Sequence, residues 1–185
     1  PFPNNANTSV IEYDGTPKPA YYWVKEAYSS LHISAKYKRI NYKPGDTFEA
    51  DIFLNSDSEK EEKYTAEIKL LNIQGQVIKN KVVKLNKNKF STFIDSISWK
   101  VNSIQNNIFF LKLELKKDEK IHSSNIYFFT TDSEYPLRPL RNLPESNLNI
   151  KQENNQYFIT NKSSITAVNV FLYEKNADNF TDFAP

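Results

Sequence analysis

An alternation of apolar and polar residues governs the middle of this chain. It is clearest in residues 47–55, TFEADIFLN, where every second residue is apolar. Successive side chains of a β-strand point to opposite faces, so this period indicates a strand with one buried face. The pattern recurs in about seven segments over roughly a hundred residues, and turns such as KPGD at 43–46 separate them. Residues 31–131 are therefore predicted to form a β-sandwich.

The spacing of these segments is typical of an immunoglobulin-like β-sandwich. The cysteine pair of antibody domains is absent, because the chain contains no cysteine. The predicted inward-facing residues are Leu31, Ile33, Ala35 and Tyr37; Phe48, Ala50, Ile52 and Leu54; Tyr64, Ala66, Ile68 and Leu70; Phe93, Ile97, Trp99 and Val101; and Phe109, Leu111, Leu113 and Leu115.

A short helix is predicted ahead of the sandwich, in TPKPAYYWVKEAY at 16–28. Pro17 and Pro19 suit a helix entry, where a missing N–H is harmless. From Ala20 onward the apolar residues, including Trp23 and Val24, recur at helical spacing and form one stripe. A helix of about ten residues is marginal alone in water, so we expect this stripe to be packed.

A second β-rich region is predicted after the sandwich. Residues 132–147 contain three prolines and no periodicity, which favours an extended linker. Strands resume in LNIKQ, QYFIT and ITAVNVFLYEK, within residues 148–185. Three or four strands cannot close a sandwich. The predicted fold class is therefore all-β, an immunoglobulin-like sandwich preceded by one short α-helix and followed by a partial second β-sandwich.

Composition argues against several partners. The 24 basic and 22 acidic residues leave a net charge of +2, so no strong field attracts nucleic acid or an acidic membrane. The chain contains no run of 18 apolar residues, so no membrane-spanning helix is predicted. The chain also lacks methionine, and we expect it to be a piece of a larger protein.

The sequence offers little for cofactor or metal binding. Gly15, Gly45 and Gly75 lie about thirty residues apart and predict turns rather than a phosphate-binding loop. His32 falls on the polar face of its predicted strand, and His122 lies far from it in sequence. Both are predicted to be surface histidines rather than metal ligands or general bases. We therefore predict no cofactor and no metal site.

Catalytic carboxylates are equally hard to assign. A glycosidase needs two carboxyl groups facing each other across a cleft, roughly 5–10 Å apart, one of them protonated. Glu12 and Asp14 are neighbours in IEYDG, but a turn before the helix explains them as well. No serine lies in a Gly-x-Ser-x-Gly elbow. No catalytic residue is predicted, and substrate-binding residues remain unassigned.

Aromatic residues and glycosylation motifs raise a binding alternative. The aromatic candidates for stacking on sugar rings are Tyr21, Tyr22, Trp23, Phe109 and Phe110. Trp23 and Phe109 belong to apolar faces, however, which favours core packing. N-x-[ST] motifs occur at Asn7, Asn161 and Asn179, as is common in an asparagine-rich chain.

The N-terminal residues resemble those of a known enzyme family. PFPN at 1–4, SVIEYDGTPKPAYYWVKEAY at 9–28 and SSLHIS at 29–34 resemble the end of the catalytic barrel in glycoside hydrolase family 2. The likeness is strongest to its β-mannosidase-like and exo-glucosaminidase-like members. DNFTDFAP at 178–185 is similar to part of the family's next β-sandwich domain.

This resemblance implies a domain organisation. Residues 1–30 would be the end of a TIM-barrel domain with its last helix, 31–131 an immunoglobulin-like domain, 132–147 a linker, and 148–185 the start of a second sandwich. Pro1, Phe2 and Pro3 would lie near the rim of the active-site face. The family's two catalytic glutamates come from earlier strands, so neither can be assigned in this chain.

The resemblance also implies a function, that of a non-catalytic C-terminal accessory region of a retaining β-glycosidase. The parent would hydrolyse terminal β-linked sugars as a β-mannosidase, β-galactosidase or exo-glucosaminidase, in the periplasm or outside the cell. The region would contact the catalytic barrel and meet carbohydrate only through the parent. Two alternatives remain, an independent carbohydrate- or protein-binding β-sandwich module and a small self-contained enzyme.

Overall fold

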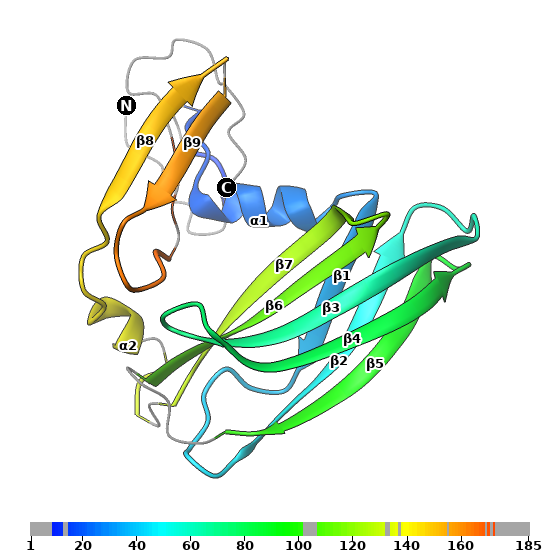
Figure 1. Ribbon diagram of the computed structural model, residues 1–185, viewed down its shortest axis with the longest axis horizontal. Coiled ribbons are helices and arrows are strands. Elements are labelled where there is room, and N and C mark those ends of the chain that lie inside the picture. The colour runs from blue at the N-terminus through cyan, green and yellow to red at the C-terminus, as the bar shows by residue number, and fades with distance from the viewer. Residues whose placement is uncertain are drawn as a thin grey trace. The chain divides into compact units, whose positions relative to one another are not determined.

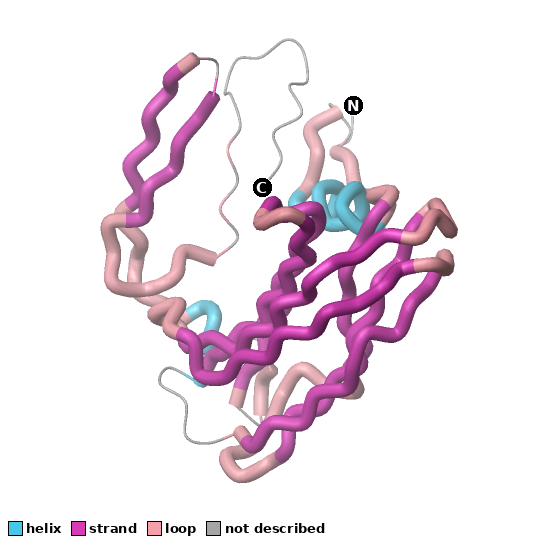
Figure 2. Tube along the Cα trace, turned by 45° about the vertical axis from the view of Figure 1, so that its right-hand side comes forward, coloured by secondary structure: helices cyan, strands magenta, loops and turns pink. Residues whose placement is uncertain are grey.

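The computed structural model describes residues 9–12, 15–101, 107–131, 134–136, 138–154, 156–168, 170 and 172. The chain divides into two compact units, Pro1–Ser29 with Ala167–Pro185, and Ser30–Thr166. Strands make up most of the second unit, as Figure 2 shows. None of the helices described is long and apolar enough to cross a membrane. The predicted four-part domain division remains a prediction.

The predicted N-terminal helix is present as α1, Pro19–Ala27. Proline occupies its first turn, and the Tyr28 N–H donates to the Val24 carbonyl at 3.0 Å where the helix ends. No α1 residue is buried, and Trp23 and Val24 are 38% and 41% exposed. The predicted packing of this stripe is therefore not found. Periodicity identifies the apolar side of a helix, but a second surface has to bury it.

All seven strands predicted between residues 31 and 131 are present. They are β1 (Leu31–Tyr37), β2 (Thr47–Ser56), β3 (Glu62–Asn72), β4 (Val77–Lys87), β5 (Ser91–Lys100), β6 (Ile108–Lys117) and β7 (Lys120–Thr130). One sheet has the order β1-β2-β5 and the other β4-β3-β6-β7, with every neighbouring pair antiparallel (Figure 1). The all-β sandwich fold is thus confirmed. The fourth strand pairs with the third, whereas in constant-type immunoglobulin domains it joins the sheet of the first two.

The core lies between the two sheets and follows the predicted faces closely. Every inward residue predicted on β2, β3 and β6 is no more than 6% exposed. At the centre, Phe48, Phe109 and Phe129 have ring centroids 4.7–5.6 Å apart, and the Tyr42 ring joins them from the β1–β2 connection. Aromatic clusters of this kind add to the hydrophobic stabilisation of burial.

One predicted core residue, Phe93, lies on the outer face instead. A β-bulge shifts the register between β2 and β5, so that Ile52 pairs with Asp95 and Phe53 with Phe93. Ile94 is the extra residue and packs against the core. A single-residue bulge moves every residue beyond it to the opposite face, and Phe93 is therefore 56% exposed.

Side chains of β7 cover the free edge of β1, where the two sheets meet. The Ile33 N–H donates to Ser123 Oγ at 3.1 Å, and the Ala35 N–H donates to Tyr127 Oη at 3.0 Å. Asn125 Nδ2 lies 3.3 Å from the Ile33 carbonyl oxygen and donates to Tyr127 Oη at 2.8 Å. These contacts satisfy backbone groups that an edge strand otherwise leaves open. We call Ser123, Asn125 and Tyr127 the β7 seam.

Residues after the sandwich are less regular than predicted. The linker contains a helical turn, α2 (Arg138–Arg141), so it is not extended throughout. β8 (Leu148–Glu153) and β9 (Gln156–Asn161) form a hairpin, which confirms two of the later strands. The described residues of the third predicted strand, 165–168, 170 and 172, are not in a strand. The Thr166 N–H donates instead to the Ile73 carbonyl at 2.7 Å.

Candidate functional site

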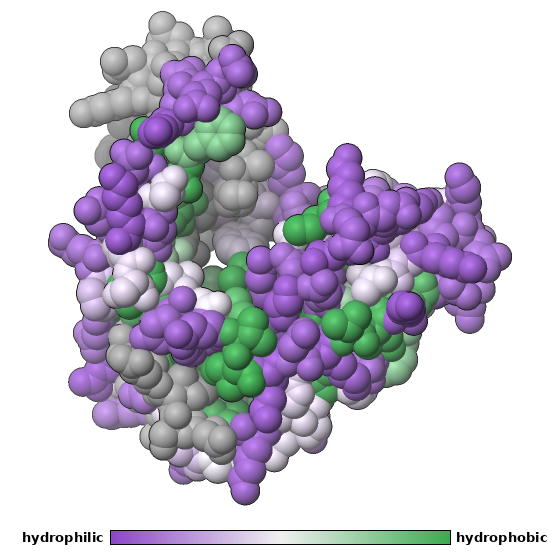
Figure 3. Space-filling view, viewed as in Figure 1, coloured by the Kyte–Doolittle hydropathy of each residue, from purple (hydrophilic) through white to green (hydrophobic). Residues whose placement is uncertain are grey.

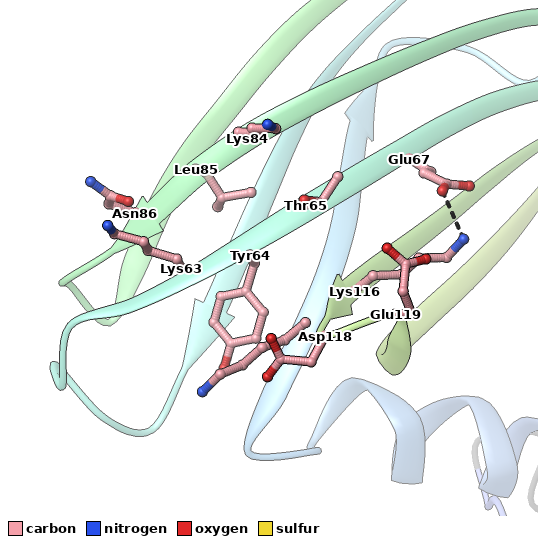
Figure 4. Close-up of a pocket in the computed structure, with 11 residues that line it drawn as sticks. Lys63, Tyr64, Thr65, Glu67, Lys84, Leu85, Asn86, Lys116, Asp118 and Glu119 are labelled. Carbon is pink, nitrogen blue, oxygen red and sulfur yellow. Dashed lines mark hydrogen bonds and ion pairs between the residues drawn. The ribbon is translucent and has the colours of Figure 1, made fainter.

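A polar groove at one end of the four-stranded sheet is a candidate site. It has a volume of about 600 Å³, and it is lined from β3, β4, β6 and the β6–β7 turn (Figure 4). Its lining residues are Lys63, Tyr64, Thr65, Glu67, Lys84, Leu85, Asn86, Lys116, Lys117, Asp118 and Glu119. We call this the charged groove. Strands distant in sequence build it, because β3 lies between β4 and β6.

Like charges face each other across β3 and β6, and this arrangement needs compensation. Glu67 pairs with Glu114 in the register, and Lys69 pairs with Lys112. Like charges directly opposite destabilise a sheet. Diagonal ion pairs offset the repulsion, since Lys69 Nζ lies 3.0 Å from Glu114 Oε2 and Lys116 Nζ lies 2.7 Å from Glu67 Oε1.

Pairs along each strand extend this network. Lys69 also contacts Glu67 at 2.5 Å, and Lys112 contacts Glu114 at 2.7 Å. Hydrogen bonds from Lys116 and Lys69 lower the pKa of Glu67. Burial of Glu114 acts to raise its pKa, but the hydrogen bonds from Lys112 and Lys69 outweigh burial and leave the pKa lowered. Both carboxylates are therefore held in the ionised form.

A tyrosine and a third carboxylate close the end of the groove. Tyr64 Oη donates to Glu62 Oε2 at 2.9 Å, and Lys117 Nζ lies 3.0 Å from Glu62 Oε1. Desolvation, together with the hydrogen bond to Glu62, raises the pKa of Tyr64 to about 12. The hydrogen bonds from Lys117 and Tyr64 lower the pKa of Glu62. Tyr64 is consequently a neutral donor at physiological pH.

This arrangement suits binding or packing better than acid catalysis. Glycoside hydrolysis requires one carboxylic acid whose pKa is raised so that it can protonate the leaving group. The pKa values of Glu62, Glu67 and Glu114 are all shifted the other way. Within the part of the chain described here, no three histidine, aspartate or glutamate side chains converge as metal ligands would.

The two histidines that were predicted to lie at the surface differ in their burial. His122 is exposed, with its ring centroid 6.0 Å from that of Tyr64. His32 is only 9% exposed, so its prediction as a surface residue is wrong. Its Nε2 lies 3.3 Å from Asn125 Nδ2, because the β7 seam reaches over the free edge of β1. Strand periodicity shows which face a residue is on but not which neighbouring strand covers that face.

The predicted carboxylate pair is described only at Glu12, since Asp14 lies outside the described residues. The Glu12 N–H donates to the Thr16 carbonyl at 2.8 Å, and the Gly15 N–H donates to the Glu12 carbonyl at 3.0 Å. Glu12 is therefore in a turn, and its side chain lies 3.8 Å from Lys18 Nζ. Gly45 and Gly75, which predicted turns, have φ angles of +92° and +76° in tight turns.

The aromatic candidates fall in different environments. Phe109 and Phe110 are at most 1% exposed, which confirms core packing for Phe109 and excludes both as stacking platforms. Tyr21 and Tyr22 make an edge-to-face pair with centroids 5.4 Å apart on α1, where Trp23 is partly exposed.

The glycosylation motifs can be judged only at Asn161, because Asn7 and Asn179 lie outside the described residues. Asn161 Nδ2 donates to the Ile165 carbonyl at 2.7 Å, and its Oδ1 accepts from the Ser163 N–H at 2.9 Å. The amide that a glycan would modify is thus already used in a turn.

The charged groove was not predicted from the sequence, although the charged residues on the outer faces of β3 and β6 can be recognised there. The outer face of β3 carries Lys63, Glu67 and Lys69, and that of β6 carries Lys112, Glu114 and Lys116. This pattern indicates charged outer faces but not their register, which decides whether unlike charges meet. Hydrophilic side chains dominate much of the surface in Figure 3, with small hydrophobic areas between them.

Comparison with known proteins gives structural neighbours alone. No protein-family model matches the chain, and no curated protein matches it. Among solved structures, a β-D-mannosidase from Dictyoglomus thermophilum is similar over 85% of this chain, at 19% identity and a TM-score of 0.57. A glycosyl hydrolase family 2 member from Bacteroides cellulosilyticus is similar over 73% of the chain, at 14% identity and a TM-score of 0.44.

A β-glucuronidase from Bacteroides uniformis is similar over 55% of this chain, at 9% identity and a TM-score of 0.40. The chain spans 13–18% of the length of these three proteins. Of the three, only the mannosidase has a TM-score above 0.5, and at 19% identity this likeness shows the fold alone.

Proposed function

We propose that this chain is a non-catalytic accessory region of a family 2 retaining β-glycosidase, of the β-mannosidase type. The observation that carries the proposal is the order of elements. Helix α1, within a stretch that resembles the family's last barrel helix, leads through three residues into the first strand of the sandwich. The fold likeness to a β-D-mannosidase over 85% of the chain supports the same reading.

The charged groove supports a structural role. Glu67 of the groove and Glu114, its register partner on β6, have lowered pKa values and are bound by lysines, so they are unsuited to donate a proton. In the parent enzyme, one carboxylate would attack the anomeric carbon while another protonates the leaving oxygen. We propose that both come from a barrel outside this chain, and that this region stabilises that barrel by contact.

Two measurements test the proposal. The purified chain is expected to show no hydrolysis of p-nitrophenyl β-D-mannoside, β-D-galactoside or β-D-glucosaminide. The gene is expected to encode, upstream of Pro1, a barrel with two glutamates at strand ends. Turnover that persists through repurification and falls in Glu67→Gln would place catalysis in the charged groove. Either that result or an upstream sequence without a barrel would overturn the proposal.

A further inference from the structure

A hollow beside α2 lies between the linker and the β1–β2 connection. It has a volume of about 690 Å³, within the range of about 300–1,000 Å³ that small-molecule sites occupy. The surface that lines it is mainly apolar. Its lining residues are Ile40, Tyr135, Pro136, Arg138, Arg141 and Asn142. We call this the arginine hollow.

The end of β7 ties two walls of the arginine hollow to the sandwich. The Thr130 N–H donates to the Ile40 carbonyl at 3.0 Å, and Thr130 Oγ1 donates to the Pro136 carbonyl. Thr130 is fully buried. One buried residue therefore holds both the β1–β2 connection and the segment that leads into α2. Because these walls are positioned in the free chain, a ligand does not have to order them, which lowers the entropy cost of binding.

Arginine is rare in this chain but concentrated at the hollow. Only three of the 24 basic residues are arginines, and two of them, Arg138 and Arg141, line it. They are three positions apart on α2, so their side chains leave the helical turn on the same side. Arginine suits a planar carboxylate better than lysine does, because its guanidinium presents N–H donors in a rigid fork. The choice of residue thus indicates a guanidinium site rather than a general positive surface.

The guanidinium group of Arg138 is oriented by its neighbours yet remains accessible. Its Cζ lies 5.6 Å from the centroid of the Tyr135 ring. Its ion pair with Glu134 is long, at 3.7 Å, and the two side chains are 52% and 70% exposed. Exposed ion pairs contribute little free energy, so an incoming carboxylate can replace that of Glu134. Within the part of the chain described, Arg141 makes no ion pair.

We propose that the arginine hollow binds a planar aromatic carboxylate. The aromatic ring packs against the apolar lining, and the carboxylate accepts hydrogen bonds from the guanidinium groups of Arg138 and Arg141. A free phosphate fits less well, because the apolar lining leaves its other oxygens without donors. A peptide segment also fits less well, since the lining described offers few neutral polar groups to the N–H and C=O groups of a backbone.

Binding is expected to be weak, because both arginines are exposed. An aromatic carboxylate of about 13 heavy atoms should have a Kd on the order of 1 mM. The inference is independent of the proposed parent enzyme, since it rests only on residues of the compact unit Ser30–Thr166.

The test is an amide NMR titration of the full chain with 2-naphthoate, at concentrations that extend well above this Kd. Saturable shifts are expected at Ile40, Tyr135, Arg141 and Asn142. The neutral analogue 2-naphthamide has the same ring system without the charge, and it is expected to bind at least about tenfold more weakly. Inorganic phosphate is titrated separately and is expected to give no saturable shifts at these residues.

Substitutions of the two arginines test the role of the guanidinium groups. Arg138→Gln and Arg141→Gln are each expected to weaken 2-naphthoate binding at least about fivefold. Arg39→Gln is the matched control and should leave the Kd unchanged, because the Arg39 side chain is 51% exposed, lies 3.0 Å from Asp46 and does not line the hollow. A double variant with lysine at 138 and 141 keeps the charge but removes both forks, and it should also bind at least about fivefold more weakly.

Thermal unfolding of each variant checks that it remains folded. Absence of saturable shifts with 2-naphthoate would overturn the proposal, as would equal binding of 2-naphthamide or unchanged binding in Arg141→Gln. Equal binding by the lysine double variant would overturn recognition by the guanidinium forks in favour of simple charge attraction. Tighter binding of inorganic phosphate than of 2-naphthoate would overturn it in favour of a phosphate site. Hydrolysis assays are separate, so failure here leaves the accessory role intact.

Discussion

Replacing Ser123 with alanine tests whether the β7 seam holds the two sheets together. Ser123 is 5% exposed, and its Oγ accepts the hydrogen bond from the Ile33 N–H at 3.1 Å. Ile33 itself is fully buried. The substitution removes this acceptor without leaving a large cavity, so the Ile33 N–H is left without its partner.

An unsatisfied buried donor costs about 1–3 kcal/mol. With a urea slope of about 2 kcal/mol/M, the unfolding midpoint should fall by about 0.5–1.5 M. Ser124→Ala is the matched control, because Ser124 is the next residue of β7 but points to the exposed face. Surface substitutions of this kind usually change stability by less than about 0.5 kcal/mol.

Urea unfolding followed by Trp99 fluorescence measures the difference. Trp99 packs against the sandwich core, and a Trp23→Phe background removes the signal of the helix. The slope should stay unchanged, since both variants expose the same surface on unfolding. If Ser123→Ala and Ser124→Ala had the same midpoint, the seam bond would contribute nothing and the reasoning would be refuted.

Three further predictions concern the turn, the ion network and a buried lysine. In the β6–β7 turn, Asp118 and Glu119 have φ angles of +50° and +61°. Glycine adopts such angles without strain, so Glu119→Gly should stabilise the folded chain by about 0.5–1 kcal/mol and raise its Tm in calorimetry, whereas Glu119→Ala should not. The folded-state pKa values of Glu67 and Glu114 are lowered, so their stabilisation is present above the ordinary pKa of 4.5 and is lost as pH falls through the lowered values. Urea midpoints from pH 7 to 3 should therefore fall less steeply in Glu67→Gln than in the parent chain, and identical slopes would contradict this. Lys87 is 1% exposed and donates to the Ser58 carbonyl at 2.6 Å. Lys87→Met removes this hydrogen bond to the 57–61 loop, so it should speed cleavage of the loop by a Glu-specific protease severalfold. Lys89→Met should leave the cleavage rate unchanged.

The sequence predicted the sandwich well because its strands carry a local signal. In β2, β3 and β6 the apolar face repeats every second residue, and burial of that face is what makes the sheet stable. The number of strands follows from the same signal. Prediction was poorer in β5, where one extra residue, Ile94, reversed the faces beyond it.

The candidate sites were harder to predict because they join distant residues. Glu67 and Lys116 are 49 positions apart and meet only when β3 and β6 pair in one register. The burial of His32 likewise depends on Asn125, 93 positions away. No local pattern specifies such contacts.

The sequence by itself determined which segments are strands and, in most of them, which face is apolar, because alternation is a property of neighbouring residues. It also placed the start of α1 through its prolines. The tertiary structure alone decided that β4 pairs with β3, that β7 side chains cover β1, and that Phe93 faces solvent beside Phe53. Each of these depends on strand order, register or a bulge, and those are set by the free energy of the whole packed core.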